Sequence, residues 1–450
     1  MSNVREFGAK GDGQTDDTVA LTHAIQRGDG HIVFSRGDYL ITRPLQVPLE
    51  TVGRISFDGS GGVARITMAG AGPALHIVGS HKSNAKPANI AEGVWTKERM
   101  PTVQGLEIVG RHAQADGVRI EGAMQPTLQG VLIRKCRHGV HLPTRDRNVL
   151  IANCHIYDNS GVGVFLDKLN LHQINIVGCH ISYCKQGGIK VVGSEIRNFQ
   201  VTGNDIEYNF DEKADTSADI LLDSREGTLR EGTIVSNTIQ ALRSPNGANV
   251  RLLGVGKGNA GAIGMFSISN NVIGDTMTSI HLQSCRGVVV TGNCTYSGFR
   301  HALVAEDCEH LVVGPNSIDH NPDYKNLSND CLVLRNCRNV TMTGLNVEHI
   351  RAPEEAPEAS ITIDGCQDVS LTGCHVLGAR SVGVLVRNSS TVRIADCTIK
   401  PRPDDKDYQA AVSVDAKSTR TMVVNNFLAK GAAGASTPPE LAAGGGNVVV

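Results

Sequence analysis

A dense run of carboxylates occupies residues 204–223, which read NDIEYNFDEKADTSADILLD. Its seven acidic residues are Asp205, Glu207, Asp211, Glu212, Asp215, Asp219 and Asp223. The formal net charge of the whole chain is only -2, so this density is local. Clustered carboxylates can transfer protons or attack carbon, can bind a hard cation such as Ca²⁺, or can simply solvate a loop. The elements that position these residues decide among the three.

Composition limits the classes of protein to consider. The 450 residues include 50 glycines, and only 4% are aromatic, which favours many short strands joined by tight turns. The charge balance lacks the basic surface typical of nucleic-acid binding, and no stretch approaches the roughly 18 apolar residues of a membrane span. We therefore expect neither nucleic acid nor a membrane as a partner. The first residues, MSNVREFGAK, lack the basic-then-apolar pattern of a secretory signal, and the sequence leaves the localisation open.

A short phrase recurs along the chain, as in NVLIANCHI, QINIVGCHI, NFQVTGNDI, VVVTGNCT, LVVGPNSI and VSLTGCHV. Each phrase is an alternating β-branched strand, a small polar corner and a second short strand; a third strand, as in GVRI, GGIKV and ADILL, recurs in step. The corner positions are mostly Asn or Cys: Cys154, Cys179, Asn204, Asn237, Asn271, Asn293, Asn316, Leu345, Cys374, Cys397 and Asn426. This pattern predicts an all-β protein, a single-stranded right-handed parallel β-helix of about 13 coils, with unpaired cysteines packed in its corners.

Residues 13–27, GQTDDTVALTHAIQR, predict a helix that covers the open end of the β-helix. Thr15 or Asp16 can cap this helix, and Val19, Leu21, Ala24 and Ile25 form its apolar face. We therefore predict an N-terminal cap segment with a capping α-helix over residues 1–48, a parallel β-helix over 49–430 and a Gly-rich C-terminal tail or cap over 431–450.

The N-terminal sequence VREFGAKGDGQTDDTVALTHAI, followed by GHIVFSRGDYLI, resembles the capping segment of the pectate-lyase-like right-handed parallel β-helix superfamily. That group includes polygalacturonases, polysaccharide lyases and phage tailspikes, so the resemblance implies a β-helix that acts on or binds glycans. The polygalacturonase signatures, an Asn-Thr-Asp followed by an Asp-Asp pair, a Gly-His-Gly and an Arg-Ile-Lys, are absent in that form, and no catalytic residue is carried over. A weaker similarity of rhythm and length links the chain to the fructan-cyclising fructotransferases.

Alternate residues of the third strand point out of the coil, so aligning this strand across coils predicts a solvent-facing column. The column reads Arg119, His141, Phe165, Lys190, Leu221, Arg251 and His281, and an adjacent outward column contains Asp219, Asn249, Ser279 and His301. Cationic and imidazole groups spaced one coil apart suit a glycan that lies along the sheet, although a solvated strand face is also polar. We expect a substrate groove on this face.

The same alignment divides the acidic run. Asp205 and Glu207 should face outward at the base of the loop, and Asp219 and Asp223 should lie on the strand that bears the groove. Our predicted catalytic residues are Asp219, Asp223 and Glu207. The predicted substrate-binding residues are Lys190, Arg251, His141, His281, Arg119 and Asp205. Asp211, Glu212 and Asp215 are interpreted as loop solvation, with a loop that has no chemistry as the alternative for the whole run.

Three reactions remain open at such a groove. Glycoside hydrolysis needs only a pair of carboxylates and is slightly favoured; β-elimination of a uronate adds Ca²⁺ and a basic residue; fructosyl transfer uses an internal sugar hydroxyl. The sequence thus predicts an enzyme that cleaves glycosidic bonds of an anionic polysaccharide or oligosaccharide, with no required cofactor and no metal site. His155 and His180 resemble a metal pair but lack a third ligand. The alternatives are a fructan-cyclising fructotransferase and a non-catalytic homotrimeric tailspike or adhesin.

Overall fold

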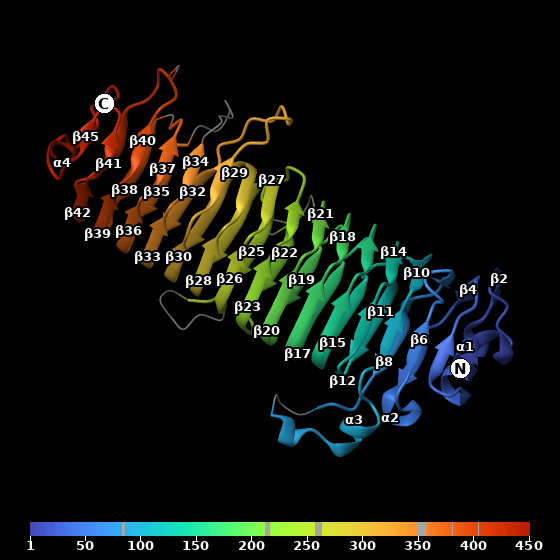
Figure 1. Cartoon of the computed structure of the whole chain (residues 1–450). Coiled ribbons are helices and arrows are strands. Elements are labelled where there is room, and N and C mark those ends of the chain that lie inside the picture. Colours follow the sequence, from blue (N-terminus) through green and yellow to red (C-terminus); the bar gives the residue numbers. More distant parts are fainter. Residues whose placement is uncertain (83–85, 212–216, 257–262, 349–356, 380, 404) are drawn as a thin grey trace. The chain divides into compact units, whose positions relative to one another are not determined.

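The computed structural model describes residues 1–82, 86–211, 217–256, 263–348, 357–379, 381–403 and 405–450. These residues form an all-β parallel solenoid of about 15 turns, slightly more than the sequence predicted. The chain divides into a first unit, Met1–Asp211 with Ala218–Thr233, and a second unit, Glu212–Ser217 with Ile234–Val450. Each unit consists of coils whose strands pair in parallel with those of the next coil (Figure 1). The prediction of a parallel β-helix is confirmed.

Three stacks of strands make up the coils, and we name them stacks 1, 2 and 3 in the order in which the chain passes through them. Stack 1 contains the β-branched strand before the Asn or Cys corner. In the first unit it comprises β1 (Ser2–Asn3), β3 (His31–Val33), β6 (Ser56–Asp58), β9 (Thr102–Gln104), β13 (Thr127–Gln129), the end of β15 (Val140–Ala152), the end of β17 (Val164–Val177) and β20 (Glu195–Thr202). The short β12 (Ala123–Met124) also pairs with β15. In the second unit it comprises β26 (Ile263–Ser269), β28 (Cys285–Thr291), β30 (Glu309–Val313), β33 (Arg338–Thr343), β36 (Gln367–Thr372), β39 (Ser390–Ala395) and β42 (Thr419–Val424). One further strand, β23, spans Thr228–Val235.

Stack 2 contains the short strand that follows the corner. Its first-unit members are β2 (Asp12–Asp16), β4 (Gly37–Ile41), β7 (Ala64–Met68), β10 (Leu106–Gly110), β14 (Leu132–Arg134), β16 (His155–Tyr157), β18 (His180–Ser182) and β21 (Asp205–Glu207). The second-unit members are β24 (Thr238–Gln240), the start of β27 (Val272–Gln283), the start of β29 (Cys294–Glu306), β31 (Ser317–Asp319), β34 (Asn346–Glu348), β37 (His375–Leu377), β40 (Thr398–Lys400), β43 (Phe427–Leu428) and β45 (Val448–Val449).

Stack 3 contains the third strand, on which the substrate groove was predicted. In the first unit it comprises β5 (Leu45–Pro48), β8 (Gly72–Val78), β11 (Ala115–Glu121), the start of β15, the start of β17, β19 (Ile189–Val192) and β22 (Ala218–Asp223). In the second unit it comprises β25 (Ala248–Leu253), the ends of β27 and β29, β32 (Cys331–Arg335), β35 (Ala359–Asp364), β38 (Val382–Arg387), β41 (Ala410–Val414) and β44 (Ser436–Thr437).

The corner between stacks 1 and 2 contains hydrogen-bonded runs of side chains in each unit. In the second unit, Asn293 Oδ1 accepts bonds from both the backbone N–H and the side-chain amide of Asn271, at 3.0 and 2.9 Å, and Asn316 repeats this arrangement one coil later. In the first unit, the backbone N–H of Cys179 donates to Asn204 Oδ1 over 2.9 Å. Asn and Cys recur at the corner because a small polar side chain can satisfy buried backbone groups of adjacent coils. The twelve cysteines are all free thiols, as predicted, and only Cys294 is exposed.

The N-terminal helix α1 spans Thr18–Arg27, which is shorter than predicted because Asp12–Asp16 forms strand β2. Asp16 Oδ1 accepts the Thr18 backbone N–H over 3.0 Å, so its carboxylate caps the first turn. Leu21, Ala24 and Ile25 are buried as expected, whereas Val19 is 55% exposed and its predicted place in the apolar face is wrong. Val19 is the second residue of α1, and its side chain lies on the solvent-exposed side of the first turn.

The remaining helices are short. They are the 3₁₀ turns η1 (Val4–Phe7) and η2 (Pro87–Asn89) and the helices α2 (Leu49–Val52), α3 (Glu92–Thr96) and α4 (Glu440–Ala443). None of the helices in the described parts of the chain is long and apolar enough to cross a membrane.

Candidate functional site

The predicted basic column exists on stack 3 of the first unit. Backbone register aligns His76 with Arg119, Arg119 with His141, His141 with Phe165 and Phe165 with Lys190. Each step is one coil, about 4.8 Å along the stack. The column therefore begins one coil earlier than the sequence indicated, at His76.

An aromatic cluster forms the centre of this column. The His141 and Phe165 rings stack with centroids 5.2 Å apart and an interplanar angle of 10°, and the His138 ring lies 5.2 Å from Phe165. Burial lowers the pKa of His138 to about 4 and, with the nearby Arg119 charge, also lowers the pKa of His141. Both imidazoles are therefore neutral at pH 7. Flat neutral rings between cationic side chains suit the stacking of a sugar ring.

The carboxylates on this face are already engaged by bases. Glu121 accepts a 2.6 Å contact from His76 Nε2 and lies 3.4 Å from Arg119 Nη2. Burial opposes its ionisation, but these two bases outweigh burial and hold the pKa of Glu121 below its ordinary value. Asp167 Oδ2 lies 3.6 Å from His141 Nε2. The carboxylates of Glu121 and Asp167 on stack 3 are thus both beside basic side chains.

Asp219 does not face the groove, so its predicted outward orientation is wrong. The side chain is fully buried at the start of β22, where Oδ1 accepts the Asn209 backbone N–H over 3.0 Å. Asn249 and Ser279, predicted in the same outward column of the second unit, are also fully buried. Strict in–out alternation fails here because the chain turns a corner as it enters stack 3, and consecutive residues face inward. A carboxylate without solvent contact cannot touch a polymer, and we withdraw Asp219 as a catalytic residue.

Asp223 lies at the end of β22 and forms a two-point ion pair with Arg225. The Arg225 guanidinium donates from Nε and Nη2 to the two carboxylate oxygens, over 2.9 and 2.6 Å. A bidentate pair of this kind occupies both oxygens of the carboxylate. Asp223 is therefore poorly placed to contact a substrate.

Asp205 and Glu207 lie on strand β21 of stack 2, a different stack from Asp219 and Asp223. In the register, Asp205 is opposite His180 and Glu207 is opposite Ser182. One ligand atom each of His180, Asp205 and Glu207 lie within 4.8 Å of one another, and His180 Nε2 is 3.8 Å from Asp205 Oδ2. Ile206 between the two acids is fully buried, so strand alternation places both carboxylates on the outer face. The structure thus brings together two of the sequence-predicted acids and a histidine. We name Asp205 and Glu207 the acid pair.

The two members of the acid pair differ in their electrostatics. Partial burial, the adjacent Asp205 charge and a hydrogen bond shared with Asp205 raise the pKa of Glu207 above its ordinary value. Two carboxyls this close favour a state in which one holds the proton and the other is ionised. His180 Nε2 lies 3.8 Å from Asp205 Oδ2. Glu207 is therefore the member of the pair whose protonated form the surroundings favour.

Two stacked tyrosines adjoin the acid pair. Tyr208 follows Glu207 directly, and its ring stacks on Tyr183 with centroids 5.3 Å apart and an interplanar angle of 24°. Tyr183 is 48% exposed, and its backbone N–H donates to the Glu207 carbonyl over 3.0 Å. The sequence analysis missed this platform. Aligning the short strands HISY and DIEY would have revealed it, because both tyrosines occupy the same position in successive coils.

The same group of side chains could hold a divalent cation. An imidazole and two carboxylates, each offering one atom within 4.8 Å of the others, form a three-ligand set of the kind found in sites with an open coordination position. Of the predicted histidine pair, this set contains His180 but not His155. His155 lies one coil away, with its ring centroid 6.0 Å from that of His180.

Arg251 and His281 lie in the second unit and are joined in a separate network. Arg251 Nε donates to His281 Nδ1 over 3.1 Å, and His281 Nε2 lies 3.2 Å from Glu306 Oε2. Burial lowers the pKa of Arg251 to about 10, while the His281 hydrogen bond and Arg335 lower the pKa of Glu306 to about 2. Sequence reasoning missed Glu306. Glu306 lies at the end of β29, two residues after Val304, which aligns with His281. An alignment that included the last residue of each strand would have found it.

A further acidic cluster in the second unit surrounds Asp330. Burial raises the pKa of Asp330 to about 7, but the carboxylate is enclosed, accepting the Gly298 backbone N–H over 2.6 Å and the Ser328 hydroxyl. Asp275, whose pKa burial also raises, accepts the Gln240 side-chain amide over 2.7 Å. Asp330 fills a corner much as Asp219 does, so we interpret it as structural. Glu212 and Asp215 of the original acidic run lie outside the described residues.

Comparison with known proteins places the chain among β-helices. The family described as "right handed beta helix region" matches residues 74–239 and 253–428, and residues 1–92 match "Rhamnogalacturonase A/epimerase, pectate lyase-like". A search of curated proteins finds no match.

Solved structures with the same fold are remote in sequence. The pre-mature gene product 12 of bacteriophage phi29 has 14% identity and a TM-score of 0.52, over 94% of this chain and 56% of that one. Tailspike protein 3 of bacteriophage CBA120 has 13% identity and a TM-score of 0.44, over all of this chain and 61% of that one. The family 28 exopolygalacturonase of Yersinia enterocolitica has 12% identity and a TM-score of 0.42, over 94% of this chain and 77% of that one. At such identities the likeness concerns the fold alone.

Proposed function

Because this chain belongs to the right-handed β-helix family, we propose that it is a polysaccharide-active enzyme that hydrolyses glycosidic bonds at the acid pair of β21. Glu207 is the general acid and Asp205 the nucleophile. The observation that carries the proposal is the electrostatic asymmetry of the pair, in which the pKa of Glu207 is raised while Asp205 faces His180. Most glycoside hydrolases use a pair of carboxyl groups whose surroundings give them different pKa values.

The separation of the two carboxyls favours a double displacement. Retaining glycosidases hold their carboxyl groups about 5–5.5 Å apart, whereas inverting enzymes leave about 6.5–9.5 Å for a water molecule. An oxygen of Asp205 and one of Glu207 lie within 4.8 Å of each other, which leaves no such gap. Asp205 attacks the anomeric carbon while Glu207 protonates the departing glycosidic oxygen. The ionised Glu207 then takes a proton from water, the hydroxide displaces Asp205, and the sugar leaves with its original configuration.

The surroundings of the acid pair support a sugar as substrate. The exposed Tyr183 ring and its partner Tyr208 offer a flat apolar face beside Glu207. Aromatic faces of this kind pack against the apolar face of a pyranose ring. On stack 3 of the same unit, Arg119 and Lys190 flank the His141 and Phe165 stack, and these cations favour an anionic glycan.

Two other reactions keep specific tests. A lyase would use a cation and would leave an unsaturated uronate. Among the described residues, His180, Asp205 and Glu207 could hold that cation. A fructan-cyclising transferase would release a cyclic disaccharide from inulin. Hydrolysis is preferred because the raised pKa of Glu207 supplies a proton donor without any added group.

A panel of polysaccharides, including polygalacturonate, alginate and inulin, tests the proposal. The expected result is new reducing ends from at least one polymer, without the ultraviolet absorbance of an unsaturated uronate and with undiminished rate in EDTA. Unsaturated product or loss of the rate in EDTA supports the metal-dependent lyase. Binding of a polymer without any product over long incubation supports a non-catalytic tailspike or adhesin, for which trimer formation in solution would be the next measurement.

A further inference from the structure

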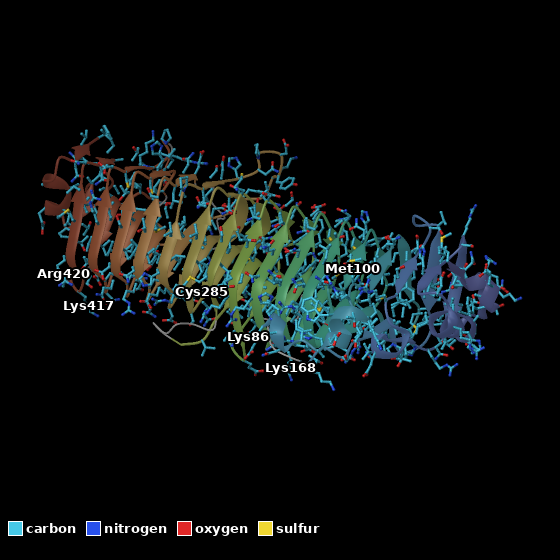
Figure 2. The ribbon with its side chains drawn as sticks, turned by 60° about the horizontal axis from the view of Figure 1, so that its bottom comes forward. Lys86, Met100, Lys168, Cys285, Lys417 and Arg420 are labelled. Atoms are coloured by element: carbon cyan, nitrogen blue, oxygen red, sulfur yellow. The ribbon has the colours of Figure 1, made fainter. Side chains whose placement is uncertain are left out.

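A helical insertion interrupts the coils between β8 and β9 of the first unit. Ile90 and Val94 of this insertion pack against Met124 in β12, with Trp95 partly buried on the same cluster. Glu98 is buried and accepts both the backbone N–H and the hydroxyl of Ser80, over 2.7 and 2.5 Å. The insertion is thus anchored at both its apolar and its polar residues. At its end, Arg99 pairs in parallel with Met124, and the Met100 backbone N–H donates to the Met124 carbonyl over 2.9 Å; Lys86 and Met100 are labelled in Figure 2.

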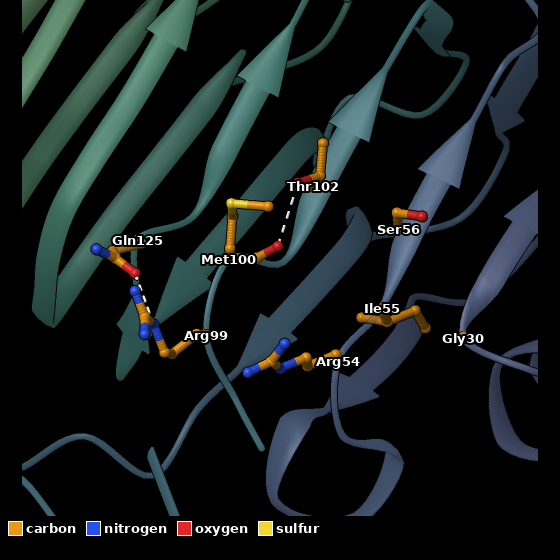
Figure 3. Close-up of a pocket in the computed structure, with 8 residues that line it drawn as sticks. All are labelled: Gly30, Arg54, Ile55, Ser56, Arg99, Met100, Thr102 and Gln125. Atoms are coloured by element: carbon orange, nitrogen blue, oxygen red, sulfur yellow. Dashed lines mark hydrogen bonds between the residues drawn. The ribbon is translucent and has the colours of Figure 1, made fainter. Parts of the chain in front are cut away.

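The insertion forms one wall of a hollow of about 450 Å³. The lining residues are Gly30, Arg54, Ile55, Ser56, Arg99, Met100, Thr102 and Gln125 (Figure 3). Arg99 Nε donates to Gln125 Oε1 over 3.0 Å, and its guanidinium carbon lies 5.3 Å from the centre of the Trp95 ring. These two contacts hold Arg99 in place in the lining of the hollow.

A second hollow, of about 400 Å³, continues along stack 1. It shares Arg99, Met100 and Gln125 with the first, and its other lining residues are Thr127, Asn148, Val149, Leu150, Gln173, Asn175 and Gln200. Strand register aligns Thr102, Thr127, Leu150, Asn175 and Gln200 in successive coils. Ser56 of the first hollow pairs with Thr102, and Gly30 lies one coil before Ser56, so the two hollows together form one groove across seven coils, on the order of 30 Å long. We name it the stack 1 groove.

Side-chain amides dominate the far part of this groove. Gln125, Asn148 and Gln173 stand at the same position of successive coils, each with a left-handed backbone (φ 56°, 53° and 70°). The Asn148 side-chain amide donates to Gln173 Oε1, but Asn148 Oδ1 is buried without a hydrogen-bond partner among the described residues. A buried acceptor without a partner destabilises the protein, so a ligand hydroxyl that donates to it would be stabilising. Rows of amides are suited to the paired donors and acceptors of sugar hydroxyls.

The charge of the groove has one sign. Neither set of lining residues contains an acid, whereas Arg54 and Arg99 line the end nearest the insertion. The chain as a whole carries slightly more acidic than basic residues, so an acid-free lining of this length is a local property. Guanidinium groups bind carboxylate or sulfate with directed hydrogen bonds.

We propose that the stack 1 groove is a second, non-catalytic glycan site that binds an acidic polysaccharide. The amides of Gln125, Asn148 and Gln173 bind sugar hydroxyls, and Arg54 and Arg99 bind a carboxylate or sulfate substituent. The acid pair lies on stack 2, so the groove holds a polymer independently of cleavage. It keeps the enzyme on its substrate and raises the local concentration of bonds to be cleaved.

The test measures binding of polygalacturonate and of neutral dextran by affinity electrophoresis and calorimetry. All proteins carry Glu207→Gln, so that cleavage does not interfere and failure of the proposed reaction cannot be confused with failure of the groove. In this background Arg99→Gln should weaken binding of polygalacturonate about tenfold, the loss of one hydrogen bond to a charged group. Gln173→Glu keeps the side-chain size, adds a repelling charge and should weaken binding by at least as much. The matched control Arg111→Gln removes an exposed guanidinium outside the groove and should change nothing.

Three outcomes would overturn the proposal. The first is equal affinity for polygalacturonate in all four proteins, the second is dextran binding as tight as polygalacturonate binding, and the third is insensitivity to salt. If Arg99→Gln disturbs the insertion, Gln173→Glu still tests the groove, because Gln173 lies on β17 and not in the insertion. With Glu207 restored, both groove variants should lose rate on the polymer, and the Arg111→Gln protein should hydrolyse it as fast as the parent.

Discussion

Replacing Glu207 with glutamine should lower kcat for glycan hydrolysis by about 10²–10⁴-fold, the usual contribution of a positioned general acid. Glutamine has the same shape but has no proton to give to the departing oxygen. Glu207 is only half-buried, and its pKa is raised by burial and by Asp205, so its surroundings accept an uncharged side chain of the same shape and the fold should be retained. The measurement is kcat for reducing-end release, with circular dichroism and thermal unfolding as checks on folding.

The matched control is Glu231→Gln, which makes the same change at an exposed residue of β23. Its kcat should equal that of the parent. A Glu207→Gln protein with the parent rate would remove Glu207 from the mechanism, and equal losses in both variants would indicate a general effect on the fold.

The dependence of the hydrolysis rate on pH tests the role of Glu207 in the unaltered protein. Hydrolysis requires protonated Glu207, so the rate should fall on the alkaline side as this carboxyl ionises. Since the pKa of Glu207 is raised, that fall should lie above the ordinary range of a glutamate. A fall within the ordinary range would assign the proton donor to another group.

Replacing Asn293 with alanine should destabilise the second unit by about 3–5 kcal/mol. Asn293 is 2% exposed; its side-chain amide donates to the Ile268 carbonyl and to Asn316 Oδ1, both over 3.0 Å, and its oxygen accepts two bonds from Asn271. Alanine leaves these buried groups without partners and leaves a cavity. Urea unfolding should show the loss, and hydrogen exchange should show that coils nearest Asn293 open first, since solenoid coils depend mainly on their neighbours.

Two comparisons separate the ladder from simple loss of an amide. Asn293→Cys introduces the residue that occupies equivalent corners at Cys374 and Cys397, and should cost less than alanine. Asn346→Ala removes an exposed amide on β34 and should change stability by less than about 0.5 kcal/mol. Equal stability of the Asn293→Ala protein and the parent would mean that the ladder contributes little to the fold.

The coils could be predicted from the sequence because the repeated residues have a structural role in every coil. The Asn and Cys corners satisfy buried backbone groups and so must recur at a fixed place, and strand alternation placed Arg119, His141, Phe165 and Lys190 in one column. The start of α1 was misplaced because Asp12–Asp16 can form a strand within the cap. Propensity alone does not distinguish that strand from the first turn of a helix.

The candidate site was predicted only in part. Alternation put Asp205 and Glu207 outside correctly, but it failed at the corner, where Asp219 is buried against Asn209. The ion pair of Asp223 with Arg225 and the raised pKa of Glu207 depend on side-chain geometry, which an alignment of the repeats does not give. The stack 1 groove likewise depends on an insertion whose anchoring to Met124 no local pattern indicates.

The configuration of the first-formed product tests the acid pair most directly. Proton NMR of the hydrolysis of a defined oligosaccharide, recorded before mutarotation, reports the anomer released at the cleaved bond. Since an oxygen of Asp205 and one of Glu207 lie within 4.8 Å, the account predicts net retention through a glycosyl intermediate on Asp205. Release of the inverted anomer would contradict it, because single displacement needs carboxyls far enough apart to hold a water molecule between them and the sugar.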